Sequence, residues 1–125
     1  MFRKLTALLT FGVVLGGGGP AFAVCKGADG VMSTLVCLDH EYKAADAELN
    51  AMWKKVMTVH PSGGDRAVHR EEIRASQRAW IAFRDADCEA QSKIGIPKYW
   101  DVNRMWCLYN ATVARTATLR EVYVN

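Results

Sequence analysis

Four cysteines carry the most distinctive chemistry in this 125-residue chain. They are Cys25, Cys37, Cys88 and Cys107. Cysteine thiols can form disulfides, bind zinc or act as nucleophiles. Zinc is disfavoured because the sequence contains no Cys-x-x-Cys pair and no histidine cluster near the cysteines. We therefore expect two disulfides, which four cysteines can form in three different ways.

Other side chains that could catalyse a reaction lack a recognisable arrangement. His40, His60 and His69 do not have metal-ligand spacing, and the serines lie in no nucleophile motif. Paired acids such as Glu71 and Glu72 are explained as helix-terminal or solvated charges. The sequence therefore predicts no catalytic residues, no metal and no cofactor, so we expect a protein that is not an enzyme.

The N-terminal segment has the pattern of a cleavable secretory signal. Arg3 and Lys4 supply positive charge, residues 5–15 are largely apolar, and a Gly-Gly-Gly-Gly-Pro stretch precedes Ala21-Phe22-Ala23. The apolar run is too short to cross a bilayer, which needs about 20 apolar residues. We expect cleavage after Ala23, a signal at 1–23, and a mature domain at 24–125 in the periplasm or outside the cell, where disulfides persist.

The charge balance excludes one class of partner. The chain has 16 Lys and Arg against 13 Asp and Glu, and losing Arg3 and Lys4 would leave the mature domain nearly neutral. It contains no basic run and no alternation of basic and aromatic residues. Nucleic acid is therefore not an expected partner, and the mature form is expected to have no membrane span.

The apolar residues recur with the period of α-helices in three segments. A first helix is expected at about 34–59, a second from an N-cap at Asp65 to about 90, and a third from about 105 to 122, with a loop at 93–98. The apolar stripe of the first segment is Leu38, Tyr42, Ala45, Leu49, Met52 and Val56. The expected fold is all-α: a small antiparallel three-helix domain stapled by two disulfides.

The helical arrangement alone does not decide how the cysteines pair. Antiparallel packing brings Cys37, Cys88 and Cys107 to the same end of the domain. Loop length favours pairing Cys25 with Cys37 and Cys88 with Cys107, because these are the shortest loops.

A polar cluster is expected where the three helices meet. Gln77, Trp80, Arg84 and Cys88 fall on one face of the second helix. Their polar members need partners, which Asp46 and Asn50 on the first helix and Arg115 on the third can supply. These residues are Asp46, Asn50, Gln77, Trp80, Arg84 and Arg115. We expect a structural network centred on Asp46, with Arg84 as its direct partner; ligand binding is the alternative.

Several of these stretches together resemble the LprI family of bacterial secreted proteins. They are Ala45-Asp46-Ala47-Glu48-Leu49-Asn50, the run Ser76 to Cys88 with its Gln-x-x-Trp-x-x-x-Arg-Asp core, Cys107, and Thr112-x-x-Arg115-x-x-x-Leu119. The resemblance implies a helical, disulfide-linked exported domain that inhibits lysozyme, the muramidase that hosts use against bacterial walls. A departure is Gly95-Ile96-Pro97-Lys98-Tyr99-Trp100, which replaces a small, glycine-rich loop.

Two functions remain open at this point. The first is inhibition of a lysozyme or related muramidase, with Tyr99 and Trp100 as candidate contacts because aromatic side chains are frequent binding hot spots. The alternative is an envelope accessory or stress protein that binds another protein or a wall component.

Overall fold

The computed structural model describes residues 24–61 and 67–125. Helix α1 spans Gly30–Val59, α2 spans Ala67–Ser92 and α3 spans Trp100–Leu119. A short 3₁₀ turn at Pro97–Tyr99 leads into α3, and a π-helical turn at Arg120–Val124 ends the chain. The expectation of an all-α, three-helix domain with two disulfides is confirmed, with no strand in the described residues.

The predicted helix boundaries need two corrections. α1 begins at Gly30, four residues before the expected start, and Thr34 Oγ1 donates a 2.8 Å hydrogen bond to the Gly30 carbonyl in its first turn. α3 begins at Trp100 rather than at about 105, because Pro97 opens a 3₁₀ turn that runs directly into the helix. The predicted N-cap at Asp65 and the predicted signal segment at 1–23 lie outside the described residues.

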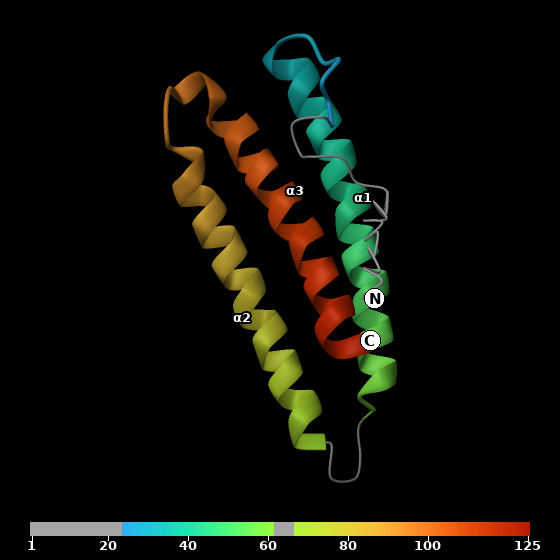
Figure 1. The fold of residues 1–125 in the computed structure, drawn as a ribbon. Helices are drawn as coiled ribbons and strands as arrows, with labels where there is room; N and C mark the ends of the chain where they lie inside the picture. The colour runs from blue at the N-terminus through green and yellow to red at the C-terminus, as the bar shows by residue number, and fades with distance from the viewer. Residues whose placement is uncertain (1–23, 62–66) are drawn as a thin grey trace, which may run out of the picture.

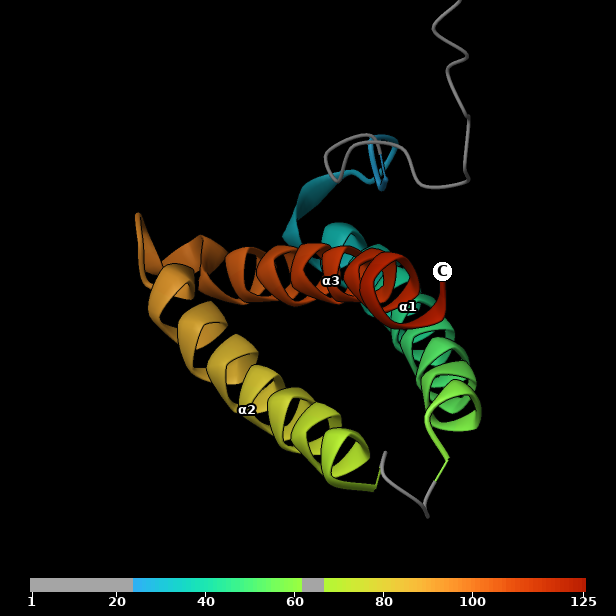
Figure 2. The same cartoon turned by 60° about the horizontal axis from the view of Figure 1, so that its bottom comes forward.

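α3 is the central helix of the domain. α1 and α2 each pack along α3, whereas they make few backbone contacts with each other. Figure 1 shows α2 running opposite to the other two helices, and Figure 2 shows α1 and α2 extending to the same side of α3, apart from each other. The three helices therefore form an open bundle in which α3 fixes the positions of both neighbours.

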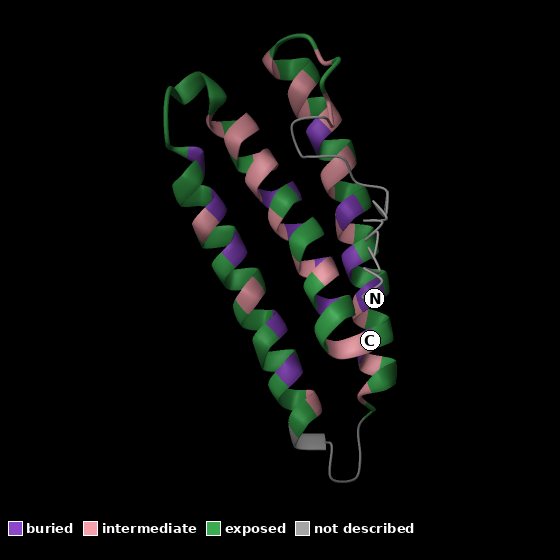
Figure 3. Cartoon of the chain, viewed as in Figure 1, coloured by how far each residue is buried: buried purple, intermediate pink, exposed green. Residues whose placement is uncertain are grey.

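The main apolar core lies where α1 ends, α2 begins and α3 ends. Its buried residues are Leu49, Met52, Val56, Ile73 and Leu119, and they are surrounded by the partly buried Trp53, Met57, Trp80, Tyr123 and Val124. α2 contributes about one buried residue per turn, so most of its surface faces solvent (Figure 3). Burial of apolar area contributes about 25 cal/mol per Å², which makes this core the main source of stability at that end.

Two disulfides and one arginine fix the remaining connections. Cys25 is bonded to Cys37 with a Cα–Cα distance of 5.7 Å, and Cys88 to Cys107 with 5.3 Å, the pairing that loop length favours. Arg70 Nη1 donates hydrogen bonds of 3.2 and 3.1 Å to the carbonyls of Met57 and His60 at the end of α1. Arg70 thereby ties the beginning of α2 to the end of α1.

None of the described helices is long and apolar enough to cross a membrane.

We predict that Leu119→Ala destabilises the domain by about 2 to 5 kcal/mol, because it removes a fully buried side chain from the junction of the three helices. Urea unfolding followed by circular dichroism measures the change. The matched control is Val122→Ala, three residues further on, whose side chain is 61% exposed and whose loss should cost about 0.5 kcal/mol or less. Equal costs for both variants would contradict the assigned core.

Candidate functional site

Trp80 on α2 is in cation–π contact with two guanidinium groups. The Arg84 guanidinium carbon is 5.1 Å from the centroid of a Trp80 ring, and that of Arg115, on α3, is 5.6 Å away. Arg84 also lies 5.9 Å from the ring of Tyr42 on α1. Such cation–π contacts contribute about 0.5 to 2 kcal/mol each. The motif of the second helix therefore does join all three helices, mainly through aromatic rings.

Arg84 uses each of its nitrogen atoms. Its Nε and Nη2 each lie 2.9 Å from Asp85 Oδ1, and its Nη1 donates a 3.3 Å hydrogen bond to Thr112 Oγ1 on α3. The Arg84 side chain is buried while Asp85 is exposed, so the ion pair is open to water on one side. Each nitrogen of Arg84 thus has a partner within the protein, and the bond to Thr112 helps to hold α2 against α3.

Arg115 makes a second link between α2 and α3, two turns nearer the beginning of α2. Its Nε donates a 2.9 Å hydrogen bond to Gln77 Oε1, and its Nη2 a 3.4 Å hydrogen bond to Ser76 Oγ. Burial lowers the pKa of Arg115 from its usual value, although a guanidinium remains protonated in proteins. Gln77 and Arg115 therefore satisfy each other at the interface between α2 and α3.

The expected ion pair between Asp46 and Arg84 is not formed. Asp46 Oδ2 accepts only a 3.5 Å hydrogen bond from Asn50 Nδ2, one turn along α1. Arg84 instead pairs with its neighbour Asp85, which it reaches without crossing to another helix, while the Tyr42 ring lies beside the guanidinium on the α1 side. The cluster is thus centred on Trp80, and Asp46 and Asn50 lie at its edge.

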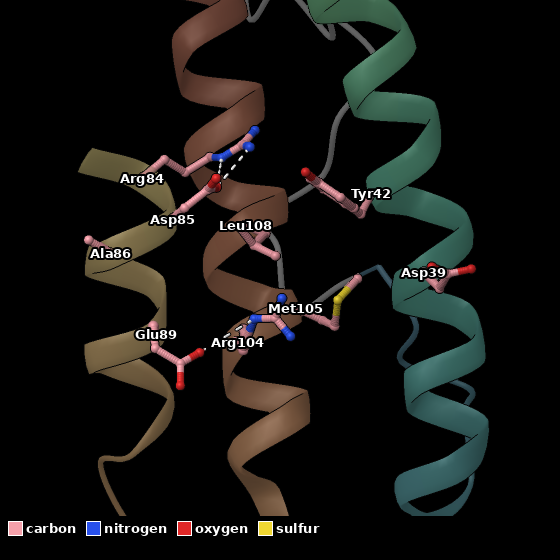
Figure 4. A pocket seen from close by; sticks show the side chains of 9 residues that line it. All are labelled: Asp39, Tyr42, Arg84, Asp85, Ala86, Glu89, Arg104, Met105 and Leu108. Carbon is pink, nitrogen blue, oxygen red and sulfur yellow. Dashed lines mark hydrogen bonds and ion pairs between the residues drawn. The ribbon is translucent and has the colours of Figure 1, made fainter. Parts of the chain in front are cut away.

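A polar groove lies between α1 and α2, with α3 as its floor. Its volume is about 600 Å³, and Figure 4 shows the side chains around it. The lining residues are Asp39, Tyr42, Arg84, Asp85, Ala86, Glu89, Arg104, Met105 and Leu108. They include three carboxylates and two guanidinium groups, so the groove carries both signs of charge.

The charges of this groove largely satisfy one another. Besides the pair of Arg84 with Asp85, Arg104 Nε lies 3.7 Å from Glu89 Oε2, and Lys43 Nζ lies 2.6 Å from Asp39 Oδ2. Within the described residues, no three His, Cys, Asp or Glu side chains are grouped so as to hold a metal ion. The charged side chains of the groove therefore form ion pairs within the protein. They do not place an acid, a base and a nucleophile within reach of one another.

Burial also affects the one phenol in this groove. It raises the pKa of the Tyr42 hydroxyl above its usual value, and the charge of Arg84 opposes part of that rise. Tyr42 therefore stays neutral and can act only as an apolar wall and a hydrogen-bonding group near pH 7.

The two aromatic residues proposed as partner contacts have different environments. Tyr99 is exposed, whereas Trp100 is partly buried and its Nε1 donates a 3.3 Å hydrogen bond to the Gly95 carbonyl. Trp100 thus supports the connection between α2 and α3, and Tyr99 is free to contact a partner. Ile94 and Ile96, which were not among the predicted contacts, are also exposed in this connection. Two isoleucines beside Gly95 in a short predicted loop were the signal in the sequence that could have indicated them.

We predict that Arg84→Ala destabilises the domain by about 2 to 4 kcal/mol, because it removes charge-assisted hydrogen bonds and the contact with Trp80. Asp46→Ala should cost about 1 kcal/mol or less, since only a long hydrogen bond from Asn50 is lost. Thermal melts of the two variants beside the parent protein compare these costs. If the two variants were equally destabilised, the result would contradict this difference and support the ion pair between Asp46 and Arg84 that the sequence predicts.

Comparison with known proteins identifies the family. The family model described as lysozyme inhibitor LprI matches residues 25–119, which include all four cysteines and the Trp80 motif. The chain is also similar to an uncharacterized protein of Rhizobium meliloti (strain 1021), with 33% identity over 109 residues that cover 78% of this chain and 77% of the relative. No solved structure matches the chain. Because the family model covers most of the chain and both disulfides, this protein belongs to the lysozyme inhibitor LprI family.

Proposed function

We propose that this protein is exported and that it binds and inhibits a lysozyme-type muramidase, so that the cell wall is protected from hydrolysis. The family match over residues 25–119 carries this proposal. Export is supported by the two disulfides, since such bonds form and persist in oxidising compartments.

The physical character of the domain suits binding by a preformed surface. Both ends of the bundle are held by crosslinks or by side-chain hydrogen bonds to the backbone, so few groups need to become ordered when a partner binds. A rigid binder keeps more of its interaction energy because it loses less conformational entropy. Such rigidity favours an inhibitor that acts by occupying a site on its target.

The chemistry of the target supports the same mode of action. Glycosidases that cleave walls with retention of configuration use two carboxyl groups about 5 to 5.5 Å apart in an open cleft. A protein that fills this cleft excludes the glycan, and a cation or hydrogen-bond donor placed there meets the carboxylates directly. The near-neutral balance of 16 basic and 13 acidic residues in the whole chain gives little long-range attraction to a basic muramidase. A local contact in the cleft therefore matters more than the overall charge.

We predict that the full chain, expressed in a bacterial periplasm so that its disulfides form, inhibits wall lysis by at least one lysozyme of animal, goose or invertebrate type. Inhibition should saturate near one inhibitor per enzyme in a turbidity assay. Reduced and alkylated protein should lose this activity, because each crosslink stabilises a small domain by about 2 to 5 kcal/mol. Lack of inhibition of every class at high micromolar concentration would instead favour an accessory envelope protein with another partner.

We further predict that protein recovered from the periplasm or the medium begins at Val24, because the Ala21-Phe22-Ala23 sequence presents small residues at the two positions that a signal peptidase recognises. Intact-mass measurement gives the cleavage site directly. Retention of residues 1–23 in the exported protein would contradict the assignment of a cleavable signal.

A further inference from the structure

The connection between α2 and α3 exposes more apolar surface than a short polar loop would. Residues 93–99, which we name the α2–α3 tip, include Ile94 at 73% exposure, Ile96 at 61% and the exposed ring of Tyr99. Figure 1 shows this connection at one end of the domain, opposite the end where α1 leads to α2. Clustered apolar side chains on a projecting segment indicate a site of protein interaction.

The α2–α3 tip is braced by side-chain hydrogen bonds from α3 and by a disulfide at its base. Asn103 Nδ2 donates hydrogen bonds of 3.3 and 3.1 Å to the carbonyls of Ser92 and Ile94, and Trp100 Nε1 bonds to the Gly95 carbonyl. The Cys88–Cys107 disulfide lies at the base of the tip and links α2 to α3.

The backbone itself reinforces this conformation. The φ angle of Gly95 is +94°, a value that favours glycine. Pro97 fixes the next turn, in which the Tyr99 amide donates a 3.0 Å hydrogen bond to the Ile96 carbonyl. Two exposed isoleucines are therefore presented on a braced loop, an arrangement that lowers the entropy lost on binding.

The charge of the tip identifies the kind of surface it suits. Residues 93–99 contain Lys93 and Lys98 and no acidic residue. Lys93 is paired with Glu89 at 3.1 Å, whereas no ion pair within the described part of the chain involves Lys98. The Lys98 ammonium lies 5.6 Å from the Tyr99 ring centroid. The tip therefore offers an apolar surface with one available cation, and the nearest acid beyond it in the sequence is Asp101 at the beginning of α3.

We infer that the α2–α3 tip is the inhibitory surface and that it enters the glycan-binding cleft of a muramidase. This inference rests on the proposed function and adds the contact residues to it. Ile94, Ile96 and Tyr99 pack against the apolar and aromatic walls that such clefts provide. Lys98 places its ammonium near the two carboxylates that cleave the glycan.

Other surfaces of the domain are less suited to this role. The groove between α1 and α2 has its charges paired internally, so a partner would have to break those pairs. Phe83 on α2 is 66% exposed, but the residues next to it on the exposed face of α2 are mostly alanines, which offer little area to a partner. Compared with these two surfaces, the tip combines large apolar side chains, an available cation and a braced backbone.

The test compares tip variants with matched controls, all in the full chain. The tip variants are Ile94→Ser combined with Ile96→Ser, and Lys98→Glu. The controls are Phe83→Ser, an exposed apolar residue on α2, and Lys55→Glu, an exposed lysine on α1. We expect the inhibition constant against the muramidase to rise about tenfold or more for each tip variant and less than about twofold for each control, as hot-spot behaviour implies. Thermal melts are expected to stay close to the parent, because every substituted side chain faces solvent.

Competition with a soluble N-acetylglucosamine oligomer provides a second measurement that does not depend on any variant. The oligomer occupies the cleft, so the apparent inhibition constant of the parent protein should rise linearly with the oligomer concentration c, by the factor 1 + c/Kd. If the parent protein inhibits but the tip variants are equally potent, or if the oligomer does not compete with the parent protein, the tip inference is overturned while the inhibitor function stands. Parent protein that inhibits no muramidase would overturn both.

Discussion

The contact of Trp80 on α2 with the Arg115 guanidinium on α3, next to the contact with Arg84, fixes how α2 lies on α3. This contact is decisive because α1 and α2 make few contacts of their own, so the position of α2 depends on its interface with α3. The interface is polar as well as aromatic: Gln77 bonds to Arg115, and Thr112 accepts from Arg84. A helix with so narrow a buried face cannot rely on apolar burial alone, and directional contacts set its register.

The same interface positions the α2–α3 tip. The contact of Trp80 with Arg115 holds the middle of α2 and α3 together. The Cys88–Cys107 disulfide joins the same two helices just below the tip. Because the helices are fixed at two levels, the connecting segment has little freedom. Asn103 and Trp100 also donate hydrogen bonds to the carbonyls of Ser92, Ile94 and Gly95. Structural residues of the family motif therefore have a functional consequence without touching a partner, because they determine where the exposed isoleucines lie.

Apolar periodicity was enough to predict three helices and their order, because each helix must bury one stripe of side chains. It misplaced the starts of α1 and α3, at Gly30 and Trp100, because first turns lie outside the core and bury little. The polar cluster was only partly predictable. Spacing places Arg84 on the correct face, but it cannot choose between Asp46 and Asp85, a choice that depends on side-chain conformation and the distance between helices. Exposure of loop residues likewise leaves no periodic signal.

The most direct test of the account maps the surface that a muramidase touches. Uniformly ¹⁵N-labelled protein, titrated with an unlabelled lysozyme that it inhibits, reports contacts through changes in its amide resonances. We expect the largest changes in residues 93–99, smaller changes in the first turn of α3, and none beyond noise along the groove between α1 and α2. Largest changes in that groove, at Tyr42, Asp85 or Arg104, would contradict it.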